Sequence, residues 1–451
     1  MSNFLLNLSG TVLGITLGAG FLAVMTLVYL PALLPKREHL IEWLTIIRKI
    51  TWRGYCEANL RAETGKALNR PYGAKRGILS FDKFQFNPVY LTKTPINNDR
   101  EIDTSVVLGP GAQKPLALKI PILIGGMAYG SGYSLAAKIA LAKAAAMAGT
   151  AANSGNGPFL EEERHYAAKY ILQYTRGFWS KSETFLKQAD MIEIALGHSA
   201  RGSAPVRISG KKITPETAAR YGAIPGLDLL MDARLPEVET PEQWKGLIQY
   251  LKEVTGGVPI GVKFGASNYL EEEMRIFIEG GADVLIFDGT EGGTHGGAPI
   301  LMDDSGAPIL PALCRAARYL RERGLKGRVS LVVGGGLVTP GDFSKCLALG
   351  ADAIIVGTIT AVAQANVQID KVVPWEPPTG LLNNDGKAKH QYDPDLGAQH
   401  LHNFFQSCIA EMILLARTLG KSSLRELNPS DMVALDPLYA KIAGVDYVSS
   451  S

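Results

Sequence analysis

Cysteine is scarce in this sequence, and its spacing excludes the common metal sites. The chain of 451 residues contains four cysteines, Cys56, Cys314, Cys346 and Cys408, and no two of them form a CxxC pair. Zinc ribbons and ordinary iron–sulfur clusters need closely spaced thiols. We therefore predict that the four thiols are free and buried in a reducing compartment, and that the chain binds no metal.

An excess of charge of either sign is also lacking. Lys and Arg total 46 and Asp and Glu total 43, which gives a formal net charge of +3. No long basic stripe is interleaved with aromatic residues, so nucleic-acid binding has no support. A hydrophobic content of 46% with 20% charged residues is typical of a globular chain. Many of the 49 glycines follow short apolar runs, a pattern typical of α/β proteins with ligand-binding turns.

The amino-terminal segment lacks charge along most of its length. No charged residue occurs between Phe4 and Leu34, a stretch longer than the roughly 20 residues that a membrane-spanning helix needs. A signal peptide would have a basic start and a shorter apolar core. Basic residues follow only on the carboxyl side, from Lys36 to Arg53. We therefore expect a single transmembrane anchor at 1–35 with the catalytic domain in the cytoplasm, with a buried core helix as the alternative.

The rest of the chain shows an alternation of short apolar runs and amphipathic segments. Residues 36–79 are mixed, and we predict a juxtamembrane helix and a connecting arm there. Predicted strands occupy 121–125, 151–153, 191–195, 227–231, 259–264, 283–288, 328–333 and 353–357. Predicted helices occupy 134–149, 161–174, 241–255, 270–280, 311–324 and 340–349. This order predicts parallel βαβ units, in a closed barrel or in an open doubly wound sheet.

Glycines after the last two predicted strands favour the closed barrel. Gly334, Gly335 and Gly336 follow one strand, and Gly357 and Thr358 follow the next. In (β/α)8 barrels the loops after strands seven and eight commonly form a phosphate site. Glycine lets backbone N–H groups approach phosphate oxygens. The sequence therefore predicts a (β/α)8 TIM barrel with a phosphate site at its carboxyl-terminal face.

Other predicted strands also end in glycine or in polar residues. Lys263 lies within the apolar run IGVKFG, where burial is costly without an anionic partner such as an isoalloxazine ring. His198 and Arg201 follow the predicted third strand, and His295 follows the sixth. Arginine can bind a carboxylate in a bidentate manner, and histidine can transfer a proton. We predict His295, Arg201 and His198 as the catalytic residues.

Taken in order, these motifs resemble the FMN-binding domain of glutamate synthase over residues 80–430. The matching segments are GGMA at 125–128, NSG at 153–155, GKKIT at 210–214, VK at 262–263, GGGL at 334–337 and GT at 357–358. The resemblance implies FMN as the cofactor. The residues it implies as FMN contacts are Gly125, Gly126, Met127, Ala128, Asn153, Ser154, Lys263, Asp288, Gly289, Gly334, Gly335, Gly336, Gly357 and Thr358.

The sequence also departs from the family pattern. The family carries an iron–sulfur cysteine cluster after the last barrel strand, whereas 361–380 contains no cysteine here. No amidotransferase domain precedes the barrel, so we do not expect glutamine hydrolysis. The family's Gly-Glu-Gly turn is Gly155-Asn156-Gly157, and its Lys-Pro-Gly-Glu-Gly-Gly loop is replaced by 197–203. The resemblance to the family therefore supports FMN binding better than it supports 2-oxoglutarate as the substrate.

The resemblance implies a flavoprotein of glutamate biosynthesis, an FMN-dependent oxidoreductase acting on CH–NH2-type donors by reductive amination of 2-oxoglutarate. A different substrate on the same barrel is one alternative, and a non-catalytic FMN-binding subunit is another. The expected electron donor is NAD(P)H, ferredoxin or a membrane carrier. Further expectations are binding of a small-molecule substrate, self-association into a homo-oligomer, and a carboxyl-terminal tail at 431–451.

Overall fold

The computed structural model describes residues 37–70, 79–294, 296–373 and 375–449. They divide into two compact units, one ending at Leu68 and the other beginning at Asn69. The described part of the first unit consists of helix α2 (Arg37–Thr64) and residues 65–68, and the helix is interrupted at Thr51, where φ is 62°. The range predicted as a juxtamembrane helix and arm thus contains one described helix.

The predicted single-pass membrane location, with a cytoplasmic catalytic domain, is contradicted. Within the described ranges, none of the helices combines the length and the apolar character that crossing a bilayer requires. The segment 1–35, on which the prediction rested, lies outside the described residues.

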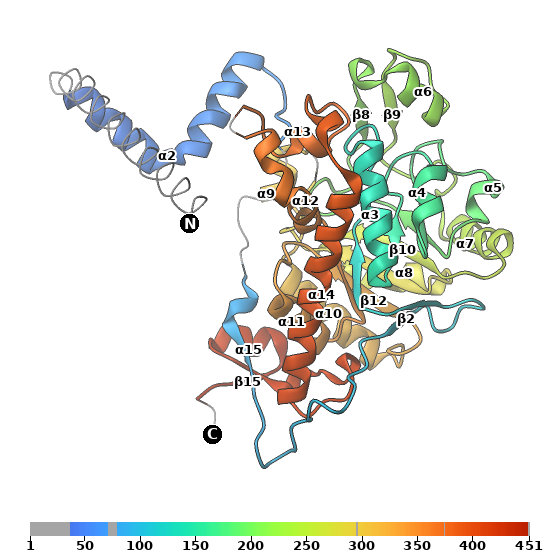
Figure 1. Ribbon diagram of the computed structural model, residues 1–451, viewed down its shortest axis with the longest axis vertical. Helices are drawn as coiled ribbons and strands as arrows, with labels where there is room; N and C mark the ends of the chain where they lie inside the picture. The colour runs from blue at the N-terminus through green and yellow to red at the C-terminus, as the bar shows by residue number, and fades with distance from the viewer. Residues whose placement is uncertain (1–36, 71–78, 295, 374, 450–451) are drawn as a thin grey trace, which may run out of the picture. The chain divides into compact units, whose positions relative to one another are not determined.

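The second unit is built around eight parallel strands (Figure 1). Their order in the sheet is β4 (Ile122–Ile124), β13 (Ala353–Val356), β12 (Ser330–Gly334), β11 (Val284–Asp288), β10 (Ile260–Gly265), β7 (Met191–Ala195), β6 (Tyr170–Tyr174) and β5 (Ala152–Asn153). The first and last of these strands lie beside each other, so the sheet nearly closes on itself. The predicted barrel fold is confirmed.

Helices connect successive strands and cover the outside of the barrel (Figure 1). They are α3 (Leu135–Ala148), α4 (Glu161–Tyr166), α5 (Glu183–Leu186), α7 (Pro241–Thr255), α8 (Leu270–Glu279), α10 (Ile309–Glu322) and α11 (Pro340–Ala348), with α14 (Pro394–Thr418) packed on α3. Shorter helices are α6 (Pro215–Tyr221), α9 (Pro299–Asp303), α12 (Thr358–Ala365), α13 (Thr379–Leu382) and α15 (Pro437–Ala443). The Ser134 hydroxyl caps α3 by accepting from the Ala137 N–H, and Gly149 ends the helix with φ 72°, as predicted.

Two predicted elements are wrong. One barrel strand was missed and one surface strand was counted as a barrel strand, so the predicted total of eight barrel strands is still correct. The range 161–174, predicted as one helix, contains the short helix α4 and the barrel strand β6. The range 227–231, predicted as a barrel strand, contains β9 (Leu229–Met231), which pairs antiparallel with β8 (Val206–Ile208). Leu230 is 66% exposed, so β9 is a surface strand, whereas all of β6 is buried, as expected of a parallel strand covered on both faces.

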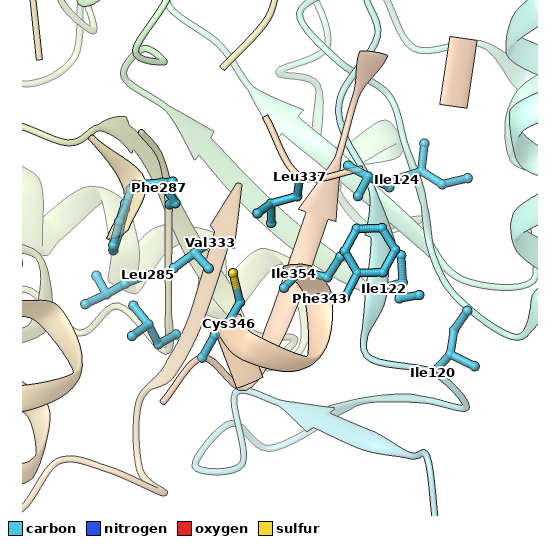
Figure 2. Packing of buried hydrophobic residues seen from close by; sticks show 14 of the residues in the cluster. Ile120, Ile122, Ile124, Leu285, Phe287, Val333, Leu337, Phe343, Cys346 and Ile354 are labelled. Carbon is cyan, nitrogen blue, oxygen red and sulfur yellow. The ribbon is translucent and has the colours of Figure 1, made fainter. Parts of the chain in front are cut away.

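The strands separate two hydrophobic layers because successive side chains point to opposite faces. On β11, Leu285 and Phe287 belong to the outer layer, whereas Val284 and Ile286 belong to the barrel interior. Figure 2 shows the outer layer, where Cys346 of α11 lies close to Val333 of β12. This alternation fixes which strand residues can reach the interior.

A hairpin closes the amino-terminal end of the barrel. Strands β2 (Val106–Leu108) and β3 (Leu116–Leu118) pair antiparallel. Their buried side chains join the same hydrophobic cluster as Leu123, Val284 and the other interior residues. The Gly109 N–H donates to the Ser330 hydroxyl at the start of β12, at 3.0 Å. The interior is therefore packed at its base and leaves room only toward the carboxyl ends of the strands.

A small separate sheet joins the two ends of the second unit. Strand β1 (Phe84–Phe86) pairs antiparallel with β14 (Met432–Ala434), which pairs in parallel with β15 (Asp446–Tyr447). Helix α15 lies between the last two strands in sequence. The described part of the range predicted as a carboxyl-terminal tail consists of these elements.

Candidate functional site

A cavity of about 760 Å³ opens at the carboxyl-terminal end of the barrel. Its volume lies within the range of small-molecule and cofactor sites. The predicted site residues that line it are Gly125, Gly126, Met127, Ala128, His198, Arg201, Lys263, Asp288, Gly335, Gly336, Gly357 and Thr358. Four others, Asn153, Ser154, Gly289 and Gly334, stand behind this lining. His295 lies outside the described residues.

The loop after β12 approaches the loop after β11 at backbone contact distance. A Cβ atom on Gly335 would lie 2.9 Å from the Gly289 nitrogen, and one on Gly336 would lie 2.8 Å from the Glu291 Cβ. Both glycines have positive φ, 117° and 69°. The Gly289 N–H donates to the Gly334 carbonyl at 2.9 Å, which holds the two loops together. Only glycine fits these positions, and the cavity wall here is backbone.

Helix α12 begins at the same side of the cavity. Its N-cap residue is Gly357, which has no side chain, and Thr358 is its first residue. The Thr360 N–H and hydroxyl both use the Gly357 carbonyl, at 2.9 and 2.7 Å. A short helix that starts after strand eight, next to a glycine loop after strand seven, is the usual phosphate site of (β/α)8 barrels.

A polar layer covers the apolar interior just below the cavity. On β10, Val262 and Phe264 pack against the helices, so Lys263 points into the barrel. The same alternation on β7 and β6 turns Glu193 and Gln173 inward. The Gln173 Nε2 donates to one oxygen of Glu193 at 2.5 Å, and Asn153 Nδ2 donates to the other at 3.1 Å. Asn153 therefore holds Glu193 beneath the cavity.

Lys263 is a buried cation that faces the cavity. Burial by itself would lower the pKa of Lys263, but the charges of Asp288 and Glu193 outweigh burial and raise it. The ammonium group makes no hydrogen bond or ion pair with any described residue, although its side chain is only 8% exposed. Its three N–H donors are thus available to a ligand in the cavity, and a ligand with acceptor oxygens fits them.

A buried lysine behind the wall fixes the Asn153–Gly155 turn. Lys138 of α3 donates to the carbonyls of Asn153 and Ser154 at 2.9 and 3.0 Å. Its ammonium also forms a fully buried ion pair with Glu163 at 2.8 Å. The Ser154 hydroxyl accepts from the Gln173 N–H at 2.9 Å. Asn153 and Ser154 therefore shape the wall and do not themselves line it.

The loop after β7 carries both described candidate catalytic residues. Arg201 donates from Nε to the Thr294 hydroxyl at 3.4 Å and from a terminal nitrogen to the Gly296 carbonyl. Burial, and then the positive charges of Lys263, Arg201 and Arg176, lower the pKa of His198 to about 3. His198 is therefore a neutral imidazole near neutral pH, available as a hydrogen-bond donor or acceptor.

Sequence reasoning missed Gln173, Arg176, Glu193 and Glu291. Arg176 is buried after β6 and donates to the carbonyls of Ser203 and Ala233 at 2.6 and 2.8 Å. It was missed because β6 was not predicted as a strand. Glu193 lies inside the apolar run MIEIA, and the reasoning used for Lys263 in IGVKFG would have found it.

Glu291 lines the cavity beside the glycine loop. One oxygen accepts from the Ile309 N–H at 2.9 Å, and the other is buried and has no hydrogen-bond partner among the described residues. Burial raises the pKa of Glu291.

In the described part of the chain, no group of three or more His, Cys, Asp or Glu side chains is placed to hold a metal ion. Cys56 is exposed, against the prediction that all four thiols are buried.

Comparison with known proteins supports a single family. The family model described as "Conserved region in glutamate synthase" matches residues 83–422. A glutamate synthase large subunit-like protein of Rhizobium meliloti is 32% identical over 430 residues, covering 90% of this chain and 96% of that protein. An archaeal-type glutamate synthase [NADPH] of Thermotoga neapolitana is 29% identical over 391 residues, covering 82% of this chain and 77% of that protein.

Solved structures share the fold at low identity. A double mutant of flavocytochrome b2 with pyruvate bound aligns with a TM-score of 0.50 and 16% identity, covering 82% of each chain. At this identity the likeness concerns the fold alone.

Proposed function

The chain belongs to the glutamate synthase family, and on that premise we propose that it is an FMN-dependent oxidoreductase whose site is the cavity at the barrel mouth. One observation carries the proposal: a wall of glycine backbone lines the same cavity as a buried lysine whose ammonium has no hydrogen-bond or ion-pair partner among the described residues. A ligand that joins a phosphate to a flat ring with acceptor oxygens suits both.

Different residues would bind the phosphate and the ring of FMN. Gly335, Gly336 and the first turn of α12 would bind its phosphate through backbone N–H groups. Gly125 and the residues that follow it would lie along the ring. Lys263 would donate to ring oxygens and favour negative charge there. FMN, when bound, supplies reversible hydride transfer at the barrel mouth.

We further propose reductive amination of a 2-oxo acid, 2-oxoglutarate first, with NADPH as electron donor. The names of the relatives support both choices, since one is a glutamate synthase large subunit-like protein and the other is an archaeal-type glutamate synthase named for NADPH. Arg201 is the candidate for binding a substrate carboxylate. Neutral His198 can donate a hydrogen bond to a carbonyl or imine in the same cavity.

A different substrate on the same barrel is the second candidate function. The turn at 155–157 and the loop at 197–203 depart from the family pattern, and 361–380 lacks cysteine. The loop carries His198, which lines the cavity. Its replacement changes the side of the site where a substrate would be bound.

The first experiment is to purify the protein, record its visible absorption, and release any cofactor with acid. We expect a stoichiometric amount of FMN without the broad absorption of an iron–sulfur centre. The holoprotein is then reduced anaerobically with NADPH and reoxidised with 2-oxoglutarate and ammonium, with pyruvate and ammonium as the comparison.

Each outcome decides between the candidates. Faster reoxidation by 2-oxoglutarate supports glutamate synthase chemistry, and reoxidation by another acceptor only supports the second candidate. FMN that no donor reduces would indicate a non-catalytic subunit. A colourless protein that takes up no added FMN contradicts the whole proposal.

A further inference from the structure

A second cavity of about 540 Å³ lies beside the main one. It is bounded by the ends of β7 and β10, by the segment leading into α7, and by α8. Gly197, Gly202 and Arg176 line both cavities, whereas His198 lines the main cavity and Ser199 lines the second. The loop at 197–203 is therefore a wall shared by the two cavities.

The floor of the second cavity is aromatic. Trp244, Phe264 and Phe277 are buried and line it. The Trp244 and Phe277 ring centroids are 5.3 Å apart, and those of Phe264 and Phe277 are 5.2 Å apart. Ala233 and Arg234, which also line the cavity, are exposed, so this side of the cavity reaches solvent. Such a surface suits the apolar body of a small organic molecule.

Three residues of this lining, Arg176, Ser199 and Trp244, each have a buried polar atom without a hydrogen-bond partner among the described residues. Arg176 and Ser199 are each 4% exposed. Among the described residues, no hydrogen bond reaches the Arg176 Nε or the Ser199 hydroxyl. Burying a donor without an acceptor costs about 1–3 kcal/mol. Native proteins leave few such groups, so each indicates a missing acceptor.

Arg176 is a buried cation without an ion pair among the described residues, and the lining of the cavity also holds Glu239 and Glu273. Two terminal nitrogens of Arg176 bind neutral carbonyls, those of Ser203 and Ala204 among them. No described carboxylate lies within ion-pair distance of the Arg176 guanidinium. Burial, and then the nearby charge of Arg201, lower the pKa of Arg176, whereas the charge of Asp232 raises it by less. A bound anion would compensate this buried cation.

We propose that the second cavity binds a small organic acid, whose apolar body lies on Trp244, Phe264 and Phe277 and whose carboxylate accepts from Arg176 and Ser199. This site is separate from the one assigned to FMN, and its existence does not depend on the proposed function.

The test is calorimetric titration of the full chain with phenylacetate, in the presence and in the absence of saturating FMN. 2-Phenylethanol serves as the uncharged comparison. We expect phenylacetate to bind under both conditions with a dissociation constant at least about tenfold lower than that of 2-phenylethanol, since hydrogen bonds to charged groups contribute about 1.5–3 kcal/mol. Binding that disappears with FMN present would place the acid in the main cavity and overturn the proposal.

Three variants test whether phenylacetate binds in the second cavity. Ser199→Ala removes one donor and should weaken phenylacetate binding about 3- to 10-fold. Val238→Trp fills the cavity from its half-buried lining position and should abolish binding. Ser209→Ala, in the lining of the main cavity, is the matched control and should change nothing. Thermal unfolding and circular dichroism check that each variant is folded.

The negative outcomes are equally clear. No binding of phenylacetate would mean that the cavity takes up no organic acid, and equal binding of 2-phenylethanol would mean that no group there recognises the carboxylate. Binding that neither Ser199→Ala nor Val238→Trp alters would place the probe outside this cavity. Each of these outcomes overturns the proposal. Because the titration without FMN stands alone, failure here is distinct from failure of FMN binding.

Discussion

The two sides of the main cavity are built in different ways. The side formed by the loops after β4, β12 and β13 presents backbone, with glycines at 125, 126, 335, 336 and 357. The side formed by the ends of β6, β7 and β10 presents Gln173, Arg176, His198 and Lys263. The first side works by shape and backbone N–H groups, and the second works by charge.

This difference indicates that one side of the cavity determines cofactor affinity and the other determines the reaction rate. A backbone wall tolerates no added atoms, but it carries little charge that a substitution could remove. A side-chain wall can change its charge with little change of shape. We therefore expect substitutions on the glycine side to act on cofactor affinity, and substitutions on the charged side to act on rate and on pH dependence.

The largest effect is expected for Gly335→Ala on the glycine side. Its φ of 117° and the backbone nitrogen 2.9 Å from the new Cβ force the loop to move. Such strain costs about 1–3 kcal/mol, and displaced N–H groups add to it, so the FMN dissociation constant should rise about 100-fold. Flavin fluorescence quenching measures this constant.

The matched control for that substitution is Gly341→Ala, where the added Cβ would meet only the Thr339 hydroxyl oxygen at 3.5 Å. Its affinity for FMN should equal that of the wild type. Equal affinities in Gly335→Ala and Gly341→Ala would show that the backbone wall is not the phosphate site.

Lys263→Met on the charged side should give the opposite pattern. It removes the buried cation that faces the cavity and keeps the chain length close. We expect the rate of flavin reduction to fall about 100-fold, because one electrostatic contact to the reacting group is lost. We expect the FMN dissociation constant to change less than about tenfold. Stopped-flow absorbance measures flavin reduction by NADPH.

Lys187→Met provides the surface comparison, since Lys187 is exposed and pairs with Glu183 one turn away. Its reduction rate should be unchanged. If Lys263→Met loses FMN binding as completely as Gly335→Ala does, the division between the two sides of the cavity does not hold.

The smallest expected effect is the contribution of His198 to the pH dependence of the free energy of unfolding. Its pKa is about 3 in the folded chain against an ordinary 6.5. Between these values only the unfolded chain binds the proton, so His198 lowers the free energy of unfolding increasingly as pH falls below 6.5. At pH 5 this amounts to about 2 kcal/mol at most.

His198→Gln should therefore lose less stability than the wild type between pH 7.5 and pH 5. Urea unfolding at both pH values measures the difference, and the exposed His390 supplies the control variant His390→Gln. Identical pH dependence in His198→Gln and the wild type would mean that His198 is solvated and titrates normally.

The glycine side was predictable from the sequence and the charged side largely was not. Glycine motifs act locally, because the residues that bind a phosphate follow one another directly after a strand. The charged side gathers single residues from separate strands, so it depends on the correct strand list. The segment EEERHYAAKYILQY has no glycine or proline to mark where α4 ends and β6 begins.

That single boundary explains most of what was missed. Without β6, neither Gln173 nor Arg176 could be placed at a strand end. The LDLLM run at 227–231 took its place because a short apolar run looks alike in a barrel strand and in a surface hairpin. Its pairing with β8 is decided by tertiary contacts that no local pattern contains.

The small sheet that joins β1 to β14 and β15 has a consequence for how the protein is made. Phe84 pairs with Ala434, so β1 cannot form this pairing until β14, far later in the chain, has left the ribosome. Until then the nascent chain carries open strand edges and uncovered apolar faces, the features that make folding intermediates prone to aggregate. The eight barrel strands end at Val356, so the barrel can close before β14 is made, and β1 is the strand that has to wait for its partner.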